Sequence, residues 1–456
     1  MAPAVEASLP SDVTSQIASR GRHITWNELP DDIKTTSRQC ILDWFGVTIA
    51  AQDEALVRIL TEDALHDGGH PAATLVGQPL KVSARQAALV NGAASHALDY
   101  DDVNYAMGGH PTVAVLPGLL ALAEQRKASG EALLTAFVAG YEVGGMIGLL
   151  VAPSHYARGF HATATVGSFA SAAACARLLG LDEPATRRAL GIAGTQAAGL
   201  KAQFGTMCKP LHAGKAAENG LLASRLAARG FTSRTDILEC VQGFAATQSD
   251  GFDAEAALRP PAGGFHLRSN LFKFNAACFG THGTIEALRR LRADNDVAPG
   301  SIAAVHVMVE PGADRMCNIR EPATGLEAKF SLRFNAALSL LGRDTADPQT
   351  YSDAATADPD LMRLRDRVVV HPMPPGWSHS LTECTVELHD GRRLSARHDV
   401  GIPATDLAEQ GRRIRDKFMS LAGPRLGEAR ARRLAEAVEG LDAGSDIAGL
   451  MALARP

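Results

Sequence analysis

The stretch ATATVGSFASAAACARLL, residues 162–179, sets the character of this chain. Alanine, the strongest helix former, recurs through it, and apolar side chains return at helical spacing. Runs of the same kind, separated by glycine or short polar loops, lie on both sides of it at residues 83–98, 113–126, 131–151, 184–198 and 213–228. The pattern predicts a helical domain that extends from about Ile33 to Val241.

The character of the sequence changes near Pro260. Residues 302–310 alternate and are rich in valine, residues 367–371 and 382–388 are strand-like, and Asp390-Gly391 is a hairpin signal. Charge-patterned helical sequence returns from Leu407. We therefore predict a mainly α protein, with a large all-helical domain formed by both chain ends (residues 1–268 and 405–456) and a smaller inserted α+β lid domain (269–404). The glycine- and proline-rich residues 260–264 are interpreted as a linker.

Composition excludes several function classes. The net charge of −5 and the lack of a long basic run argue against nucleic acid as a partner. The longest apolar stretches, around residues 113–123 and 146–152, are too short to span a bilayer, so no membrane partner is expected. Seven cysteines without paired spacing suggest reduced thiols rather than disulfides or a zinc site, and the first residues lack the apolar core of a secretory signal. We expect a cytoplasmic protein.

The segment HALDYDDVNYAMGGHP, residues 96–111, concentrates titratable groups in a largely apolar region. If the helix that begins near Ser83 continues to Asp102, then His96, Asp99 and Asp102 share one face, while Asp101 points elsewhere. His110 precedes Pro111, a residue that often opens a helix. His110 is therefore expected at the positive end of a helix, where free backbone N–H groups can hold a carboxylate.

The same arrangement recurs at three further predicted helix starts. His161 precedes the alanine-rich run at 162–179, Lys209 and His212 precede a helix expected to open at Ala213, and His282 opens another. If these helix ends converge, they form a pocket for a substrate with several negative charges. The histidines would then be available as acid and base near neutral pH.

Each of these residues also has a purely structural interpretation. A histidine before a helix is often a cap or a solvated loop residue. The three aspartates could solvate a helix end or bind magnesium or calcium, although no calcium-loop spacing or phosphate-binding motif accompanies them, and we predict no metal. Arg320 could clamp a substrate carboxylate or tie down a loop, and the sequence leaves both readings open.

With these residues identified, the chain resembles the 2-methylcitrate dehydratase and cis-aconitate decarboxylase family, also called MmgE/PrpD, over nearly its whole length. The resemblance rests on an ordered set of motifs: HALDYDD (96–102) with HP (110–111), GFHATAT (159–165), KPLHAG (209–214) and AKFSL (328–332). It implies a helical domain with an α+β lid, homodimers, and action without metal or organic cofactor on small di- and tricarboxylates.

By the resemblance, the catalytic set would comprise Asp99, His110, His161, Lys209 and His282. We assign His161 as the leading acid or base, His110 with Asp99 as the second proton-transfer pair, and Lys209 and His282 as groups that hold substrate carboxylates. His212 and Arg320 are further substrate-binding candidates.

Two positions depart from the family pattern. Val103 stands where relatives commonly have threonine, and Phe334 where they often have tyrosine. Because both replacements remove a hydroxyl, they favour a 2-methylcitrate dehydratase-like hydro-lyase over a cis-aconitate-type decarboxylase. The alternatives are that decarboxylase, an epimerase or racemase of an imino- or amino-dicarboxylate, and a non-enzymatic sensor of carboxylate metabolites.

Overall fold

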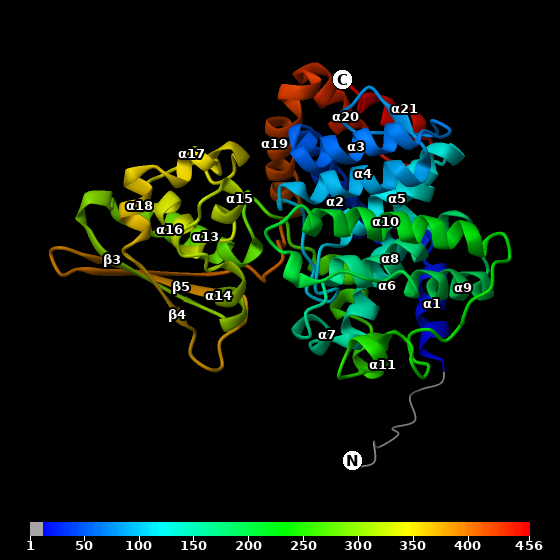
Figure 1. Cartoon of the computed structure of the whole chain (residues 1–456), viewed down its shortest axis with the longest axis horizontal. Helices are drawn as coiled ribbons and strands as arrows, with labels where there is room; N and C mark the ends of the chain where they lie inside the picture. Colours follow the sequence, from blue (N-terminus) through cyan, green and yellow to red (C-terminus); the bar gives the residue numbers. More distant parts are fainter. Residues whose placement is uncertain (1–11) are drawn as a thin grey trace, which may run out of the picture. The chain divides into compact units, whose positions relative to one another are not determined.

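The computed structural model describes residues 12–456 and divides the chain into two compact units. The helical unit contains Met1–Ala97, of which residues 12–97 are described, together with Asp101–Asn270 and Thr405–Pro456. The smaller unit contains Leu98–Tyr100 and Leu271–Ala404. The predicted fold class is confirmed: the protein is mainly α, and a smaller α+β unit is inserted into a helical unit built from both chain ends (Figure 1). The first residues, on which the expectation about a secretory signal rests, lie outside the described part.

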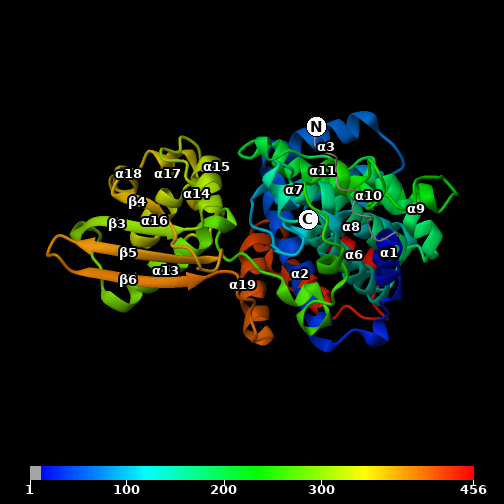
Figure 2. The same cartoon turned by 90° about the horizontal axis from the view of Figure 1, so that it is seen from below.

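The helical unit consists almost entirely of α-helices, with one short two-stranded sheet. Its helices are α1 (Val13–His23), α2 (Asp31–Ala50), α3 (Ala55–Asp67), α4 (Ala84–Ala97), α5 (Pro111–Arg126), α6 (Gly130–Val151), α7 (Ser154–Ala157), α8 (Ala162–Leu178), α9 (Glu183–Gly194), α10 (Cys208–Ala227), α11 (Phe244–Gln248), α12 (Ala254–Leu258), α19 (Leu407–Leu426), α20 (Glu428–Glu439) and α21 (Ile447–Leu453), and its strands are β1 (Ala73–Thr74) and β2 (Lys81–Val82). The returning helix α19 packs against α2, as both views show (Figures 1 and 2).

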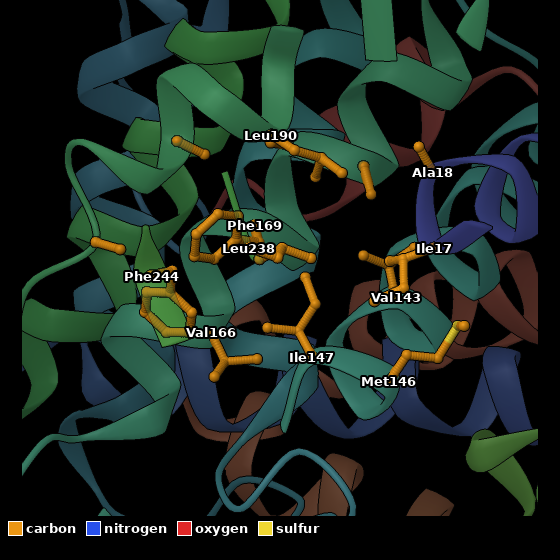
Figure 3. Packing of buried hydrophobic residues seen from close by; sticks show 14 of the residues in the cluster. Ile17, Ala18, Val143, Met146, Ile147, Val166, Phe169, Leu190, Leu238 and Phe244 are labelled. Carbon is orange, nitrogen blue, oxygen red and sulfur yellow. The ribbon is translucent and has the colours of Figure 1, made fainter. Parts of the chain in front are cut away.

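Helix α6 lies at the centre of an apolar core of the helical unit. Val143 and Ile147 of α6 contact a cluster that includes Ile17 of α1, Phe169 of α8 and Leu190 of α9 (Figure 3). These side chains are fully buried. Removing large apolar side chains from water is the main force that holds such helices together, because helix propensity alone is weak.

The same helix corrects one expectation from the sequence. Helix α6 has 22 residues with a mean hydropathy of 1.6 in its most apolar window, so it is long and apolar enough to cross a membrane by length and composition. Nearly all of that window is buried inside the unit, and the helix carries the buried Glu142. Its apolar character therefore reflects a position in the core. The expectation that no apolar stretch is long enough was wrong, because only residues 146–152 were counted as the apolar stretch in this region.

Glycines let two of the helices approach unusually closely. A Cβ atom on Gly92 of α4 would lie 2.6 Å from the Cα of Gly214 of α10, and one on Gly214 would lie 2.2 Å from the carbonyl oxygen of Leu89. Only residues without a side chain fit at such a crossing. The contact brings the end of α4, with His96, beside the beginning of α10.

The smaller unit contains a mixed sheet and a set of short helices. Its elements are α13 (Phe279–Asn295), β3 (Ile302–Val309), α14 (Pro311–Cys317), α15 (Gly325–Ala328), α16 (Leu332–Leu340), α17 (Asp353–Thr356), α18 (Pro359–Arg365), β4 (Val368–Pro372), β5 (Leu381–Leu388) and β6 (Arg393–Asp399). The sheet order is β4-β3-β5-β6; β3 and β4 are parallel, and the other neighbours are antiparallel.

The alternation of the strand sequences determines which face of the sheet is covered. Val305 and Val307 of β3 and Cys384 and Val386 of β5 are fully buried, while the residues between them are partly exposed. Helix α13 packs against β5 and β6, and α16 packs against α13 and β4, on the same side of the sheet (Figure 1). The predicted hairpin at Asp390-Gly391 is confirmed, and Gly391 takes a left-handed φ of 88°.

Three residues from the loop after α4 belong to the smaller unit. The Nζ of Lys273 donates to the carbonyl oxygen of Asp99 at 2.7 Å and to its Oδ1 at 2.9 Å. The Nζ of Lys329 donates to the carbonyl oxygen of Leu98 at 3.2 Å. Both lysines are buried, so main-chain oxygens help to satisfy their charges.

Several predicted element ends need correction. Helix α4 ends at Ala97 rather than Asp102, because Asp99 adopts a left-handed φ of 52°, and His96, Asp99 and Asp102 do not share a helical face. Helices α10 and α13 begin earlier than predicted, at Cys208 and Phe279. Pro210 is tolerated in α10 because first-turn N–H groups have no acceptor within the helix.

Residues 260–264, predicted as a linker, lie inside the helical unit. Arg20 donates to the carbonyl oxygen of Gly264 at 2.8 Å. The guanidinium groups of Arg20 and Arg268 lie 5.5 and 5.9 Å from the ring centre of Phe265. The division between units falls after Asn270 instead.

Candidate active site

In the helical unit, the predicted site residues lie at the starts of three packed helices, and His96, which was not predicted as a site residue, lies at the end of a fourth. His110 and His161 are the N-cap residues of α5 and α8, Lys209 and His212 lie in the first turns of α10, and His96 lies in the last turn of α4. Within the described residues, neither N-cap imidazole makes a capping hydrogen bond to its own helix. Both histidines thus occupy N-cap positions, but their side chains do not cap these helices.

Asp101 joins two of these histidines. The Nδ1 of His96 lies 2.9 Å from Asp101 Oδ1, and the Nδ1 of His110 lies 2.9 Å from Asp101 Oδ2. The same His110 nitrogen lies 2.9 Å from the carbonyl oxygen of Asp102. The ring centres of His96 and His110 are 4.5 Å apart. His110 therefore contacts Asp101, which was expected to point elsewhere.

His161 extends this group of rings. Its ring stacks on that of His96 with centres 5.9 Å apart, and its Nδ1 lies 3.0 Å from the Nδ1 of His212. The edge of Phe204 closes another side, with ring centres 5.0 Å apart. We call His96, His110, His161 and His212 the histidine cluster. Three of the four predicted helix starts thus come together in the helical unit.

Burial keeps much of the histidine cluster neutral. It lowers the pKa of His96 to about 3, although the Asp101 charge opposes the change. Burial also lowers the pKa of His161 well below its ordinary value, and it lowers the pKa of His212 with help from the Lys209 charge. Neutral imidazoles at neutral pH can accept a proton, which is what a general base must do.

The pKa values of the two neighbouring aspartates are shifted in opposite directions. Burial would raise the pKa of Asp101, but the charges and hydrogen bonds of His96 and His110 outweigh it and hold that pKa well below its ordinary value. Burial raises the pKa of Asp102 to about 7. The Asp102 carboxyl accepts a hydrogen bond from the Thr112 hydroxyl at the start of α5. Asp101 is thus an ionised partner of histidines, and Asp102 holds a helix end.

Lys209 brings a positive charge to the histidine cluster. Its side chain is largely buried, and its Nζ lies 5.6 Å from the ring centre of Phe204. Helices α5, α8 and α10 begin beside the cluster, and helix N-termini carry partial positive charge. Neutral bases, a lysine and helix N-termini are together suited to a carboxylate substrate from which a proton is removed.

The remaining predicted residues belong to the smaller unit. The Asp99 carboxylate pairs with Lys273. His282 lies in the first turn of α13, where its Nε2 is 3.1 Å from the carbonyl oxygen of Ala277. Arg320 is exposed in the segment after α14, beside Arg333.

Both positions that depart from the family pattern are buried. Val103 lies in the helical unit between Asp102 and the turn that leads to His110, and Phe334 is fully buried in α16 of the smaller unit. Neither side chain has a polar group that could bind or move a proton. The structure therefore provides no hydroxyl at either position.

Sequence reasoning missed the roles of Asp101 and Lys273. Asp101 was set aside because the helix was extended too far. Lys273 stands between Phe272 and Phe274 in a largely apolar stretch of the sequence, and this is the signal that could have found it. A lysine in an apolar run must be paired when it is buried.

The histidines and the carboxylate around Asp101 are also residue types that bind metal ions. The candidate ligand atoms of His96, Asp101 and His110 lie within 4.8 Å of one another. However, Asp101 already pairs with His96 by a hydrogen bond, and the Nδ1 of His110 lies 2.9 Å from its other oxygen. Both nitrogens would have to lose their protons to bind a metal together with this carboxylate. The arrangement is explained better by hydrogen bonding.

Comparison with known proteins agrees with the motifs. A family model described as the MmgE/PrpD N-terminal domain matches residues 15–257, and the MmgE/PrpD C-terminal domain matches residues 276–443. Cis-aconitate decarboxylase of Mus musculus is 29% identical over 97% of this chain and 93% of its own length. The enzyme of Homo sapiens is 28% identical over 90% and 89%, and that of Aspergillus terreus is 27% identical over 98% and 97%.

Proposed function

The chain belongs to the MmgE/PrpD family, and from this premise we propose that it is a cofactor-independent lyase of a small di- or tricarboxylate. The observation that supports the proposal is the histidine cluster with Lys209 at the joined starts of α5, α8 and α10. Neutral His161 moves a proton at the carbon next to a carboxylate. Lys209 and the helix N-termini hold that carboxylate and stabilise the negative charge that develops on it.

Within this class, loss of carbon dioxide is the first reaction to test. The curated relatives that align over nearly the whole chain are named cis-aconitate decarboxylases. When an unsaturated tricarboxylate loses carbon dioxide, the electron pair of the broken C–C bond forms a new double bond. The former double bond then takes a proton. One group must deliver that proton to carbon, and a positive charge must face the remaining carboxylate.

Dehydration is the second candidate, and Val103 and Phe334 favour it because neither carries the hydroxyl common in relatives. In this reaction a base removes a proton next to a carboxylate, and the leaving hydroxide takes a proton from an acid. Two proton-transfer groups are required, and the histidine cluster contains more than two imidazoles.

A single experiment separates these reactions. The protein is incubated in deuterated water with cis-aconitate, 2-methylcitrate, citrate and amino-dicarboxylates, and products are followed by proton NMR with parallel measurement of carbon dioxide. Carbon dioxide release with one deuterium in the product identifies a decarboxylase, and an alkene without carbon loss identifies a hydro-lyase. Exchange with inversion would point to an epimerase. Binding without turnover across the panel would overturn the proposal in favour of a sensor.

A further inference from the structure

The hydrogen bonds of Asp101 determine where two histidine rings carry their protons. Asp101 is almost fully buried, and its Oδ1 lies 2.9 Å from the Nδ1 of His96. Its Oδ2 lies 2.9 Å from the Nδ1 of His110 and 3.1 Å from that of His96. An ionised carboxylate can only accept hydrogen bonds. Both Nδ1 atoms must therefore carry hydrogen. His110 Nδ1 faces a second acceptor, the Asp102 carbonyl oxygen, which reinforces the same assignment.

A neutral imidazole that is protonated at Nδ1 has its lone pair at Nε2. In His96 that Nε2 is buried and has no hydrogen-bond partner among residues 12–456. A buried polar atom without a partner is costly and therefore uncommon. The atom is available to a ligand or to a proton, and it belongs to a ring that stacks on His161.

We propose that Asp101 is a positioning residue of the reaction, which holds His96 and His110 in the same tautomer so that both rings present an unprotonated Nε2. The inference rests on the proposed function and adds His96 to its proton-transfer groups. When a substrate proton reaches either Nε2, that ring becomes an imidazolium, and the Asp101 charge stabilises it through the existing Nδ1–H hydrogen bond. One carboxylate charge supports one imidazolium, so the second ring stays neutral.

The variant Asp101→Asn tests this role with little change in shape. An amide has one oxygen that accepts and one NH₂ group that donates, so it can accept from only one of the two Nδ1–H groups. If the amide oxygen accepts from His110, His96 must move its proton to Nε2 or lose its partner; if it accepts from His96, His110 keeps only the Asp102 carbonyl oxygen as an acceptor. In both cases the negative charge that stabilises an imidazolium is lost. We expect kcat to fall on the order of a hundredfold or more, with a much smaller change in KM. Asp102→Asn is the matched control, because an amide can still accept from Thr112, and this variant should keep near wild-type turnover.

The tautomers themselves can be measured without any substrate. In protein with ¹⁵N-labelled histidine, the ring nitrogen shifts distinguish protonated from unprotonated nitrogens, and His96→Gln and His110→Gln assign the signals. Hydrogen on Nδ1 of both rings in the wild type, with one ring altered in Asp101→Asn, is the expected result. Hydrogen on Nε2 of either ring in the wild type would overturn the inference, even if Asp101→Asn did not fold. Wild-type kcat in a folded Asp101→Asn variant would overturn it as well.

Because the NMR readout requires no turnover, it is independent of the substrate panel. If no substrate of the panel reacts but the NMR spectra show the expected tautomers, the proposed reaction is rejected and the role of Asp101 in fixing the tautomers stands. Turnover of a panel substrate with the opposite tautomers would reject the role of Asp101 alone.

Discussion

The Nδ1 atoms of His161 and His212 face each other at 3.0 Å. At this distance one nitrogen donates its hydrogen and the other accepts, so the two rings cannot both carry a proton at Nδ1. Burial, which lowers the pKa of both histidines, agrees with at least one neutral ring. The pair thus restricts the two rings to arrangements in which only one Nδ1 carries a hydrogen.

His161→Ala should lower turnover far more than apparent affinity. Loss of a well-placed acid or base typically costs on the order of a hundredfold or more in rate. Separate determination of kcat and KM checks this, together with the pH–rate profile, which should lose one limb. His212→Gln, which retains the His161 ring, is expected to have an intermediate effect. Near wild-type turnover with an unaltered profile in His161→Ala would show that His161 only ends a helix.

Lys209→Met should change both affinity and pH dependence. Burial is the largest cause that lowers the pKa of His96 and of His161, and the Lys209 charge lowers both values further. Its removal should raise both pKa values and shift the acidic limb of kcat/KM to higher pH, while KM rises on the order of tenfold or more through loss of a charge-assisted contact. Lys215→Met is the control on the same helix, because Lys215 is half exposed and pairs with Glu218. Equal effects in both variants would contradict a specific role for Lys209.

Gly214→Ala should destabilise the helical unit. The added methyl group would collide with the Leu89 carbonyl oxygen of α4, and a backbone atom cannot move away cheaply. Overpacking of this kind costs roughly 1–3 kcal/mol. Gly423→Ala in α19 is the control, because the added methyl group meets nothing within 4 Å. This substitution should leave the free energy of unfolding unchanged or raise it. Denaturant unfolding of both variants measures the difference, and equal stabilities would refute the close helix contact.

His266 should make stability depend on pH. Burial lowers its pKa from 6.5 to about 4. Between these values the unfolded chain binds a proton that the folded protein does not, so the free energy of unfolding should fall as the pH drops from 6.5 to about 4, by up to about 3 kcal/mol. His266→Phe should reduce the slope of the free energy of unfolding against pH in this range, whereas His70→Phe at an exposed position should leave that slope unchanged. Urea unfolding at several pH values measures it, and parallel slopes in all three proteins would be inconsistent with a buried neutral His266.

Metal removal should leave activity unchanged. Asp101 already pairs with the Nδ1 atoms of His96 and His110, and the proposed reaction needs only proton transfer by histidines. We expect full turnover after extensive treatment with EDTA. Activity that disappears and returns with magnesium, manganese or zinc would identify these residues as ligands and exclude the proton-transfer mechanism.

The sequence predicted what depends on local pattern. Alanine-rich runs and alternating valines are local properties, so helices α4, α5, α6, α8, α9 and α10 and strands β3, β4 and β5 were recognised, and Asp390-Gly391 identified the hairpin. His110 and His161 were placed at helix starts for the same reason.

Features that depend on tertiary contacts were missed. The end of α4 was extended too far because Asp99 adopts a left-handed conformation while pairing with Lys273, more than a hundred residues away in the chain. Once α4 was extended, Asp101 appeared to point away from the histidines. Its actual partners depend on the path of the loop between α4 and α5, and no periodic pattern encodes that path.

Leu98–Tyr100 give the smaller unit a property that its continuous stretch, Leu271–Ala404, does not reveal. A polypeptide made of residues 271–404 alone would lack the Leu98 and Asp99 oxygens that Lys329 and Lys273 bind. Leaving buried ammonium groups short of acceptors is costly. The smaller unit is therefore not a transplantable module: moved into a foreign protein, it would need this tripeptide supplied from outside its own stretch.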